Sequence, residues 1–398
     1  MVVLSAAVAY VLPAVAVGAA ETRTTIVSLP VGTQVAGLAV GAGALWVANG
    51  RAGTVLRIDP ETNQLVASIR IAEPSPTCDR CWGAVAAVGD VVWAAMDAAG
   101  PKIFRIDISS NGVAETIDVG VLPTAMTLDD AESVWLTGNL QDVVLRVDPR
   151  VVGGVARTVV HLPSGIFVAP DSVWVTARQA GTNGHLIRLN PITGVVKATI
   201  PVGRDPGPVV AGDGFAWVAN EADHTLSRID ANTTSVVSTI PVIERPIGIA
   251  IGRGAVWVAS RGAPLVSRPS VSRVDTRTGV VVETIPIDDA SPFAMTAGAD
   301  ALWIASHNPD EVVRIGPVPL PANVAQASPP AVSVVMFGLV TTLVLVAVGV
   351  RGSSGHHSGS RSRLAGYLLS ELLLARQGRR QDHAAVGNAE RPAPELRT

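Results

Sequence analysis

Charged residues and lysine are scarce in this chain of 398 residues. Charged residues make up 16% of the sequence, hydrophobic residues make up 48%, and the formal net charge is −3. This composition excludes a largely disordered chain, which needs high charge and low hydrophobicity. Lysine occurs at Lys102 and Lys197, and the arginines before residue 351 are scattered. We therefore expect no nucleic-acid partner, because such proteins carry clustered basic residues.

Cysteine is equally scarce, since Cys78 and Cys81 are the two cysteines of the sequence. They belong to a Cys-Asp-Arg-Cys-Trp segment. A zinc site would need two further ligands, a c-type haem would need histidine in place of Trp82, and a thioredoxin-like site would need a helix after the motif. The sequence offers none of these contexts. Outside the cytoplasm, a local disulfide is the favoured interpretation, and a redox role is the alternative.

Two uncharged apolar segments lie near the ends of the chain. Residues 1–20 end in small residues, with Gly18 and Ala20 spaced for cleavage after Ala20. They predict a secretory signal peptide, and a retained N-terminal anchor is the alternative because no basic residue comes first. Residues 331–350 are long enough to cross a hydrocarbon core of ~30 Å as a helix. A buried core helix is the alternative for this second segment.

The charges that flank residues 331–350 predict the orientation of the chain. Arginines follow this segment, so the positive-inside rule places residues 351–398 in the cytoplasm and the preceding residues outside. We expect a Pro/Ala linker over residues 319–330 and a flexible tail over 351–398, which is rich in Gly, Ser, His and Arg. Within the tail, apolar residues 364–375 are flanked by arginines and are suited to lie on an anionic inner leaflet. A small cytoplasmic partner is the alternative.

The centre of the chain repeats two short phrases in a fixed order. The first contains tryptophan, as in ALWVAN (44–49), FAWVAN (215–220) and AVWVAS (255–260). The second is an arginine phrase such as RID (57–59), which follows each tryptophan. Steps of 47, 42, 39, 43, 40 and 46 residues separate the tryptophans of the seven phrases, which are Trp46, Trp93, Trp135, Trp174, Trp217, Trp257 and Trp303. The sequence therefore contains seven repeat units.

Each repeat unit predicts four short β-strands. The units contain runs rich in Val, Ile and Thr, separated by turn sequences such as DANT (230–233). Units of roughly 40 residues with four strands are typical of β-propeller blades. The seventh unit stops at Gly316 without a fourth strand, whereas residues 25–31 match the fourth-strand phrase ahead of the first unit. We therefore predict an all-β, seven-bladed propeller over residues 21–318, in which the N-terminal strand closes the last blade.

The repeated side chains have architectural interpretations. The seven tryptophans are expected to fill the spaces between blades rather than to stack on ligands. The repeated arginines are expected to pair with acidic neighbours or to cover the blade edges.

These phrases resemble a known family of repeats. WVAN, RIDP and TIPVG, together with the turn at Thr193 and Gly194, look like the YVTN-type (YncE-like) propeller repeats over about three quarters of the chain. The resemblance implies the architecture, because the functions in that family are mixed or unknown. The streptogramin (virginiamycin B) lyase propellers are more distantly similar, and their metal site uses His and Glu from the central face. Their WFTE phrase is replaced here by WVAN, WLTG or WIAS.

The expected site is one mouth of the propeller. The loops after each tryptophan phrase and the loops entering each first strand should emerge on the same face of their blades. A mixture of Arg, Asn and His without paired acids suits recognition of a polar or anionic ligand, or of a protein, better than acid–base chemistry. The candidate ligand-binding residues are Asn49, Arg51, Asp97, Asn139, Arg178, Asn220, His224, Arg261 and His307.

The resemblance to the lyases implies an alternative function, a metal-dependent lyase or hydrolase with Mg²⁺ as cofactor. Its metal ligands would be Glu221, His224, His307 and Glu311. The simpler interpretation is that these four are solvated loop residues without a metal. The favoured function is a binding or scaffolding module for a protein or small polar ligand. We expect this module to be monomeric, to need no cofactor and to be anchored in the cell membrane with its propeller outside the cytoplasm.

Overall fold

The computed structural model describes residues 25–32, 34–75, 82–252, 254–263, 266–287, 290–307 and 309–316. The predicted signal peptide, linker, membrane segment and tail lie outside these residues, as do Cys78 and Cys81. The chain divides into two compact units, and all the described residues belong to the first, Met1–Val340. Within the described ranges, no helix has the length and apolar character that crossing a membrane requires.

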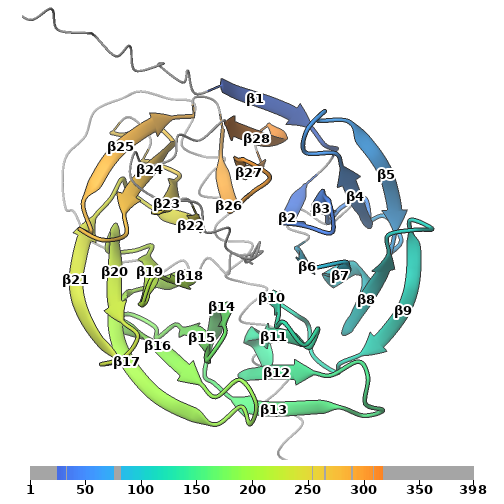
Figure 1. The fold of residues 1–398 in the computed structure, drawn as a ribbon, viewed down its shortest axis with the longest axis horizontal. Helices are drawn as coiled ribbons and strands as arrows, with labels where there is room; N and C mark the ends of the chain where they lie inside the picture. Colours follow the sequence, from blue (N-terminus) through green and yellow to red (C-terminus); the bar gives the residue numbers. More distant parts are fainter. Residues whose placement is uncertain are drawn as a thin grey trace, which may run out of the picture. The chain divides into compact units, whose positions relative to one another are not determined.

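The described strands form seven antiparallel sheets of four strands each, arranged as blades in a ring (Figure 1). The first blade contains β2 (Val35–Gly41), β3 (Ala44–Asn49), β4 (Thr54–Ile58) and β5 (Leu65–Arg70), and the second contains β6 (Gly83–Val88), β7 (Val91–Met96), β8 (Lys102–Asp107) and β9 (Gly112–Asp118). The third contains β10 (Ala125–Leu128), β11 (Val134–Gly138), β12 (Val143–Val147) and β13 (Val155–Val159). Short 3-10 helices, η1 (Asp97–Ala99) and η2 (Asn139–Gln141), follow β7 and β11.

The remaining four blades repeat this order. The fourth contains β14 (Pro163–Ala169), β15 (Ser172–Ala177), β16 (Asn183–Leu189) and β17 (Val196–Arg204), and the fifth contains β18 (Pro206–Gly212), β19 (Phe215–Asn220), β20 (Thr225–Asp230) and β21 (Ser235–Pro241). The sixth contains β22 (Pro246–Gly252), β23 (Ala255–Ser260), β24 (Ser270–Asp275) and β25 (Val281–Pro286). The seventh contains β26 (Pro292–Gly298), β27 (Ala301–His307), β28 (Asp310–Gly316) and β1 (Thr25–Pro30).

The N-terminal strand closes the ring, as the sequence predicted. β1 pairs with β28 along its whole length, from Thr25 opposite Gly316 to Pro30 opposite Glu311. The pairing covers an edge of the seventh blade that would otherwise expose unpaired backbone groups. The seven-bladed prediction and its N-terminal closure are therefore both confirmed.

The core lies between the blades. The second strand of each blade is almost wholly buried, whereas most residues of the outermost strand are exposed or half-buried; β3 and β5 show this contrast. Each repeat tryptophan is at most 1% exposed, which confirms its predicted place in the core. Burial of seven large aromatic side chains in equivalent places makes them a principal source of packing energy.

The repeated arginines stack on the tryptophans. Trp and Arg are directly opposite on neighbouring strands, as Trp174 and Arg188 are in the fourth blade. The guanidinium carbon of Arg188 lies 5.2 Å from the centre of the Trp174 ring, within the range of a cation–π contact. Equivalent contacts are present in five further blades, through Arg57, Arg146, Arg228, Arg273 and Arg314.

Several of these arginines also join one blade to the next. Arg57 donates to the carbonyl oxygen of Ile108 in the second blade (2.7 Å), and Arg188 donates to that of Ala231 in the fifth blade (2.7 Å). The accepting carbonyls lie at the turns between the third and fourth strands. Charge-assisted hydrogen bonds of this kind hold neighbouring blades in register.

The aspartate that ends the arginine phrase caps the turn that follows. The Asp59 carboxylate accepts hydrogen bonds from the backbone N–H groups of Glu61 (2.8 Å) and Thr62 (3.1 Å). Asp107 accepts from the Ser109 and Ser110 side chains and from the Ser109 backbone, and these bonds lower its pKa to about 2. The aspartates of these phrases therefore serve the turns on the face opposite the predicted mouth.

Candidate functional site

The register of the first two strands in each blade builds the mouth. The first residue of the innermost strand lies opposite the last or the next-to-last residue of the second strand, as in the pairs Asn220 and Pro206, Ser260 and Pro246, and Ser306 and Pro292. Loops that leave the second strand and loops that enter the first strand therefore emerge together. Polar residues on these loops can act on one ligand although they come from different blades.

Glu221 and Arg245 join the loops of the fifth and sixth blades. Glu221 is 9% exposed, and its carboxylate lies 3.3 Å from the Arg245 guanidinium. The Arg245 backbone N–H donates to Nδ1 of His224 at 3.1 Å. Nδ1 of His224 is therefore an acceptor here, which leaves Nε2 as the position for its proton. Both His224 and Arg245 have positive φ angles, of 58° each, so the two loops turn sharply where they meet.

Arg261 extends this group toward the seventh blade. It follows β23, and its Nε donates to the carbonyl oxygen of Pro292 at the start of β26 (3.3 Å). Removal from water lowers the pKa of Arg261, and the charge of Arg245 lowers it further, while Glu221 acts in the opposite direction. Arg261 remains a cation, because the ordinary pKa of arginine is far above neutrality. Its charge is incompletely balanced by the groups around it.

His307 completes the group at the end of β27. Part of its side chain is exposed, and its ring lies edge to face with Phe293 at a centroid distance of 3.9 Å. Removal from water lowers the pKa of His307, the charge of Arg261 lowers it further, and Asp310 and a hydrogen bond with the Val35 backbone act in the opposite direction. His307 is therefore neutral at pH 7, since its ordinary pKa is 6.5 and the shift is downward.

We call Glu221, Arg245, Arg261 and His307 the mouth cluster. Three successive blades contribute these residues, which are linked by one ion pair and by mutual electrostatic effects. Two permanent cations and one titratable imidazole face one carboxylate. Such an arrangement can bind an anionic or strongly polar group, and the neutral imidazole can gain a proton when that group arrives.

The other sequence-predicted residues lie elsewhere around the mouth or turn into the sheets. Arg178 pairs with Asp205 at 3.0 Å, between the fourth and fifth blades. Asp97 lies in η1, where burial raises its pKa although it accepts a hydrogen bond from the Ala98 N–H. Asn139 is 8% exposed in η2. Arg51 lies beside a groove at the first blade.

Two asparagines among the predicted ligand-binding residues make internal hydrogen bonds instead. Asn220 is fully buried, and its Nδ2 donates to the hydroxyls of Thr225 (3.0 Å) and Ser227 (2.9 Å). Asn49 is 3% exposed, and its Nδ2 donates to the carbonyl oxygen of Val31 (2.9 Å). Neither side chain extends into the mouth, because the amide is held against its own sheet or the preceding loop.

The residues proposed as metal ligands do not form one site. Glu221 and His224 belong to the loop after β19, whereas His307 ends β27 and Glu311 lies in β28 opposite Ser306. Glu221 is already paired with Arg245. Across the described ranges, no three His, Cys, Asp or Glu side chains come close enough together to hold a metal ion. A magnesium site of the kind that the lyase resemblance implies does not fit this arrangement.

The sequence did not identify Arg245, which is central to the mouth cluster. Arg204 at the end of β17 and Glu244 next to Arg245 also precede first strands, but both already have partners. Arg204 pairs with Asp223, and Glu244 accepts a hydrogen bond from the Ser267 hydroxyl. The turn at His224 and Arg245 brings the Arg245 backbone to the histidine, and a positive φ at a non-glycine residue leaves no reliable sequence signal.

Comparison with known proteins identifies similar folds. No family profile matches the sequence, and no curated protein gives a significant sequence match. Among solved structures, virginiamycin B lyase from Staphylococcus aureus matches with a TM-score of 0.59 and 18% identity, over 74% of this chain and 99% of the lyase. The likeness is one of fold. It agrees with the distant resemblance to the streptogramin lyase propellers that the sequence shows.

Propellers with other roles are equally similar in shape. Kuenenia stuttgartiensis hydrazine synthase matches with a TM-score of 0.58 and 14% identity, over 71% of this chain and 95% of that chain. The Cps50 (Swd1) β-propeller domain of Myceliophteria thermophila matches with a TM-score of 0.60 and 11% identity, over 74% of this chain and 100% of that domain. Because these proteins differ in role, the shared architecture does not assign a function to this chain.

Proposed function

We propose that this protein is a propeller-based binding module whose mouth cluster takes a small polar ligand with negative charge. The observation that carries the proposal is the environment of Arg261. This cation is largely removed from water, lies near a second arginine and has the neutral His307 as a neighbour. Burial of a cation in such surroundings is costly unless an anion compensates for it.

A bound anion would change the electrostatics of the mouth cluster in a defined direction. It would offset the repulsion between Arg245 and Arg261, and it would raise the pKa of His307 by favouring the imidazolium form. Protonation of His307 would then add a third positive charge. Anion affinity is therefore expected to increase as the pH falls through the range just below 6.5, the ordinary pKa of this histidine.

We further propose that the module is displayed outside the cytoplasm and anchored by residues 331–350. Support for this part comes from the sequence, in the uncharged segment of membrane-spanning length and the arginines that follow it. Residues 1–20 would direct export. Protease treatment of intact cells should degrade the propeller and spare a tag placed after residue 398; the reverse pattern would overturn the proposed orientation.

Thermal unfolding of the purified full-length protein tests the proposed binding. A ligand that binds the folded state alone raises the thermal midpoint, by an amount equivalent to about 2.7 kcal/mol at one hundred times its Kd. Phosphate, sulfate and citrate are the anionic probes, and Mg²⁺, Ca²⁺ and Zn²⁺ are the metal probes. We expect at least one anion to raise the midpoint, and Arg261→Gln to abolish that shift.

A matched control separates specific binding from a general salt effect. Arg150 is exposed and pairs with Asp148 at a turn on the opposite face, so Arg150→Gln should keep the full shift. An anion shift that is the same in Arg261→Gln would contradict the proposal. A shift produced by a divalent metal and not by anions would instead favour the metal-dependent lyase or hydrolase.

A further inference from the structure

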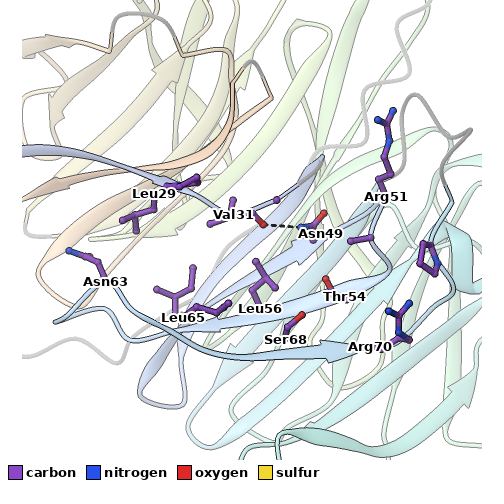
Figure 2. Close-up of a pocket in the computed structure, with 15 residues that line it drawn as sticks. Leu29, Val31, Asn49, Arg51, Thr54, Leu56, Asn63, Leu65, Ser68 and Arg70 are labelled. Atoms are coloured by element: carbon purple, nitrogen blue, oxygen red, sulfur yellow. Dashed lines mark hydrogen bonds between the residues drawn. The ribbon is translucent and has the colours of Figure 1, made fainter.

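A groove separates β1 from the first blade, away from the mouth cluster. Its volume is about 830 Å³, within the size range of small-molecule sites. Leu29 and Val31 line one side, and residues of β4 and β5, including Leu56 and Leu65, line the other (Figure 2). The groove exists where the N-terminal strand, rather than a strand of the preceding repeat, packs beside the next blade.

The strand register arranges the walls of the groove in rows. At one end, Asn49, Thr54 and Arg70 are consecutive cross-strand partners on β3, β4 and β5. Two residues further along β4, Leu56 lies opposite Ser68, and Ile58 then lies opposite Leu65. The four-residue advance from the polar row to the last apolar row corresponds to roughly 13 Å. The groove is therefore polar and basic at one end and apolar at the other.

Asn49 presents an unused acceptor at the polar end. It is 3% exposed, its Nδ2 donates to Val31, and its Oδ1 is buried without a hydrogen-bond partner. Buried polar atoms normally have a partner, so this oxygen is a place where a ligand N–H or O–H could donate. Arg70 is exposed in the same row and supplies a positive charge. Figure 2 shows Arg51 and Arg70 at the end of the groove opposite Leu29 and Leu65.

Asn220 of the fifth blade is the repeat equivalent of Asn49, and its surroundings differ. There the Asn220 amide donates to Thr225 and Ser227 of its own sheet. Leu56 occupies the position of Ser227 in the first blade, so it cannot accept such a bond and instead offers an apolar surface to the groove. Oδ1 of Asn220 is also unpartnered, and a glycine packs closely against each amide: an added Cβ would lie 2.5 Å from the Asn220 Cγ at Gly203 and 2.5 Å from the Asn49 Nδ2 at Gly32. Asn49 differs in that it lines an open groove.

We propose that the groove binds a short apolar peptide through its free C-terminal carboxylate. The carboxylate would pair with Arg70, a peptide N–H would donate to Oδ1 of Asn49, and apolar side chains would contact Leu56 and Leu65. Leu65 is 60% exposed, so a ligand would remove considerable apolar surface from water. A simple fatty acid has a carboxylate and an apolar chain but no donor for Asn49. This assignment is independent of the mouth cluster and of any anion bound there.

Calorimetric titration of the full-length protein tests the assignment. The probes are N-acetyl-Leu-Ala-Leu with a free carboxylate, the same peptide as its C-terminal amide, and dodecanoate. We expect the acid to bind and the amide to bind about tenfold more weakly, because a charge-assisted hydrogen bond is lost. Arg70→Gln should reduce the affinity for the peptide acid to that of the amide, and Leu65→Ser should reduce the affinity for both peptides.

Two exposed positions provide matched controls. Val66→Ser changes the neighbour of Leu65 on β5, and Arg157→Gln removes an exposed arginine from the outer strand of the third blade; both should bind the acid normally. The assignment fails if the acid does not bind at about 1 mM, if acid and amide bind equally, or if Arg70→Gln has no effect. Dodecanoate binding as tightly as the peptide acid would also overturn it, in favour of a lipid site.

Discussion

Replacement of Arg188 by methionine tests the claim that the repeated arginines hold the blades together. Methionine keeps much of the apolar stem that covers Trp174 but removes the guanidinium. That group makes three contacts. It lies 5.2 Å from the Trp174 ring centre, donates to the Ala231 carbonyl at 2.7 Å, and pairs with Asp171 at 2.8 Å. The Arg188 side chain is 14% exposed, so most of these contacts are shielded from water.

The expected loss is the sum of these three contacts. The charge-assisted hydrogen bond to the next blade contributes about 1.5–3 kcal/mol. The stacking contact adds about 0.5–1 kcal/mol. The ion pair adds less than about 0.5 kcal/mol, because the Asp171 side chain is 75% exposed and solvent screens the interaction. Arg188→Met should therefore lower the free energy of unfolding by about 2–4 kcal/mol.

Guanidinium-induced unfolding followed by tryptophan fluorescence measures this loss directly, since seven tryptophans are buried between the blades. Arg105→Met is the matched control. Arg105 occupies the same position opposite Trp93 but is exposed, and its loss should change stability by less than about 0.5 kcal/mol. Equal stability of Arg188→Met and the unaltered protein would refute the reasoning, as would an equal loss in both variants.

Three further predictions concern ring closure and pH. Deletion of residues 25–30 should expose the β28 edge and cause self-association or loss of cooperative unfolding, measured by size-exclusion chromatography and denaturation; unchanged behaviour would contradict closure. Because the pKa of folded His307 lies below its ordinary 6.5, stability should decline as the pH falls below about 6.5, and His307→Gln should flatten that decline in pH-dependent denaturation. Because the pKa of folded Asp107 is about 2, its contribution should be present above about pH 4 and disappear toward pH 2; equal acid sensitivity in Asp107→Asn would count against this role.

The sequence predicts the architecture because the repeated phrases can be recognised in the sequence itself. The sequence itself shows a tryptophan and four apolar runs in each full unit, and it shows the displaced fourth-strand phrase at residues 25–31. Closure by β1 could be predicted for the same reason, since one strand is missing at the end of the array and one is present before it. Local propensity and global fold agree at these positions, which makes such predictions dependable.

The contacts of the repeated arginines could be predicted from the sequence less completely. The sequence predicted pairing with acidic neighbours, which Arg146, Arg188 and Arg273 confirm. It did not predict that most of these arginines also stack on the tryptophan directly opposite. That contact depends on strand register, and turn geometry and bulges fix the register rather than the number of residues between Trp and Arg.

The candidate site was predicted in part. The face could be anticipated, and Arg261 and His307 lie on it with Glu221. Asn49 and Asn220 end their strands as the sequence shows, but their amides turn inward to buried partners. Side-chain direction at a strand end depends on the loop packed beside it, which the repeat pattern does not specify.

The most direct test of the central claim is a titration of the mouth cluster. Calorimetry should compare the unaltered full-length protein, Arg261→Gln and Arg150→Gln, with the anion that gives the largest thermal shift. We predict binding that tightens as the pH falls below about 6.5, a loss of affinity of at least about tenfold in Arg261→Gln, and normal binding in Arg150→Gln. Equal affinity in all three proteins, or affinity that does not depend on pH, would contradict a ligand site at the mouth cluster.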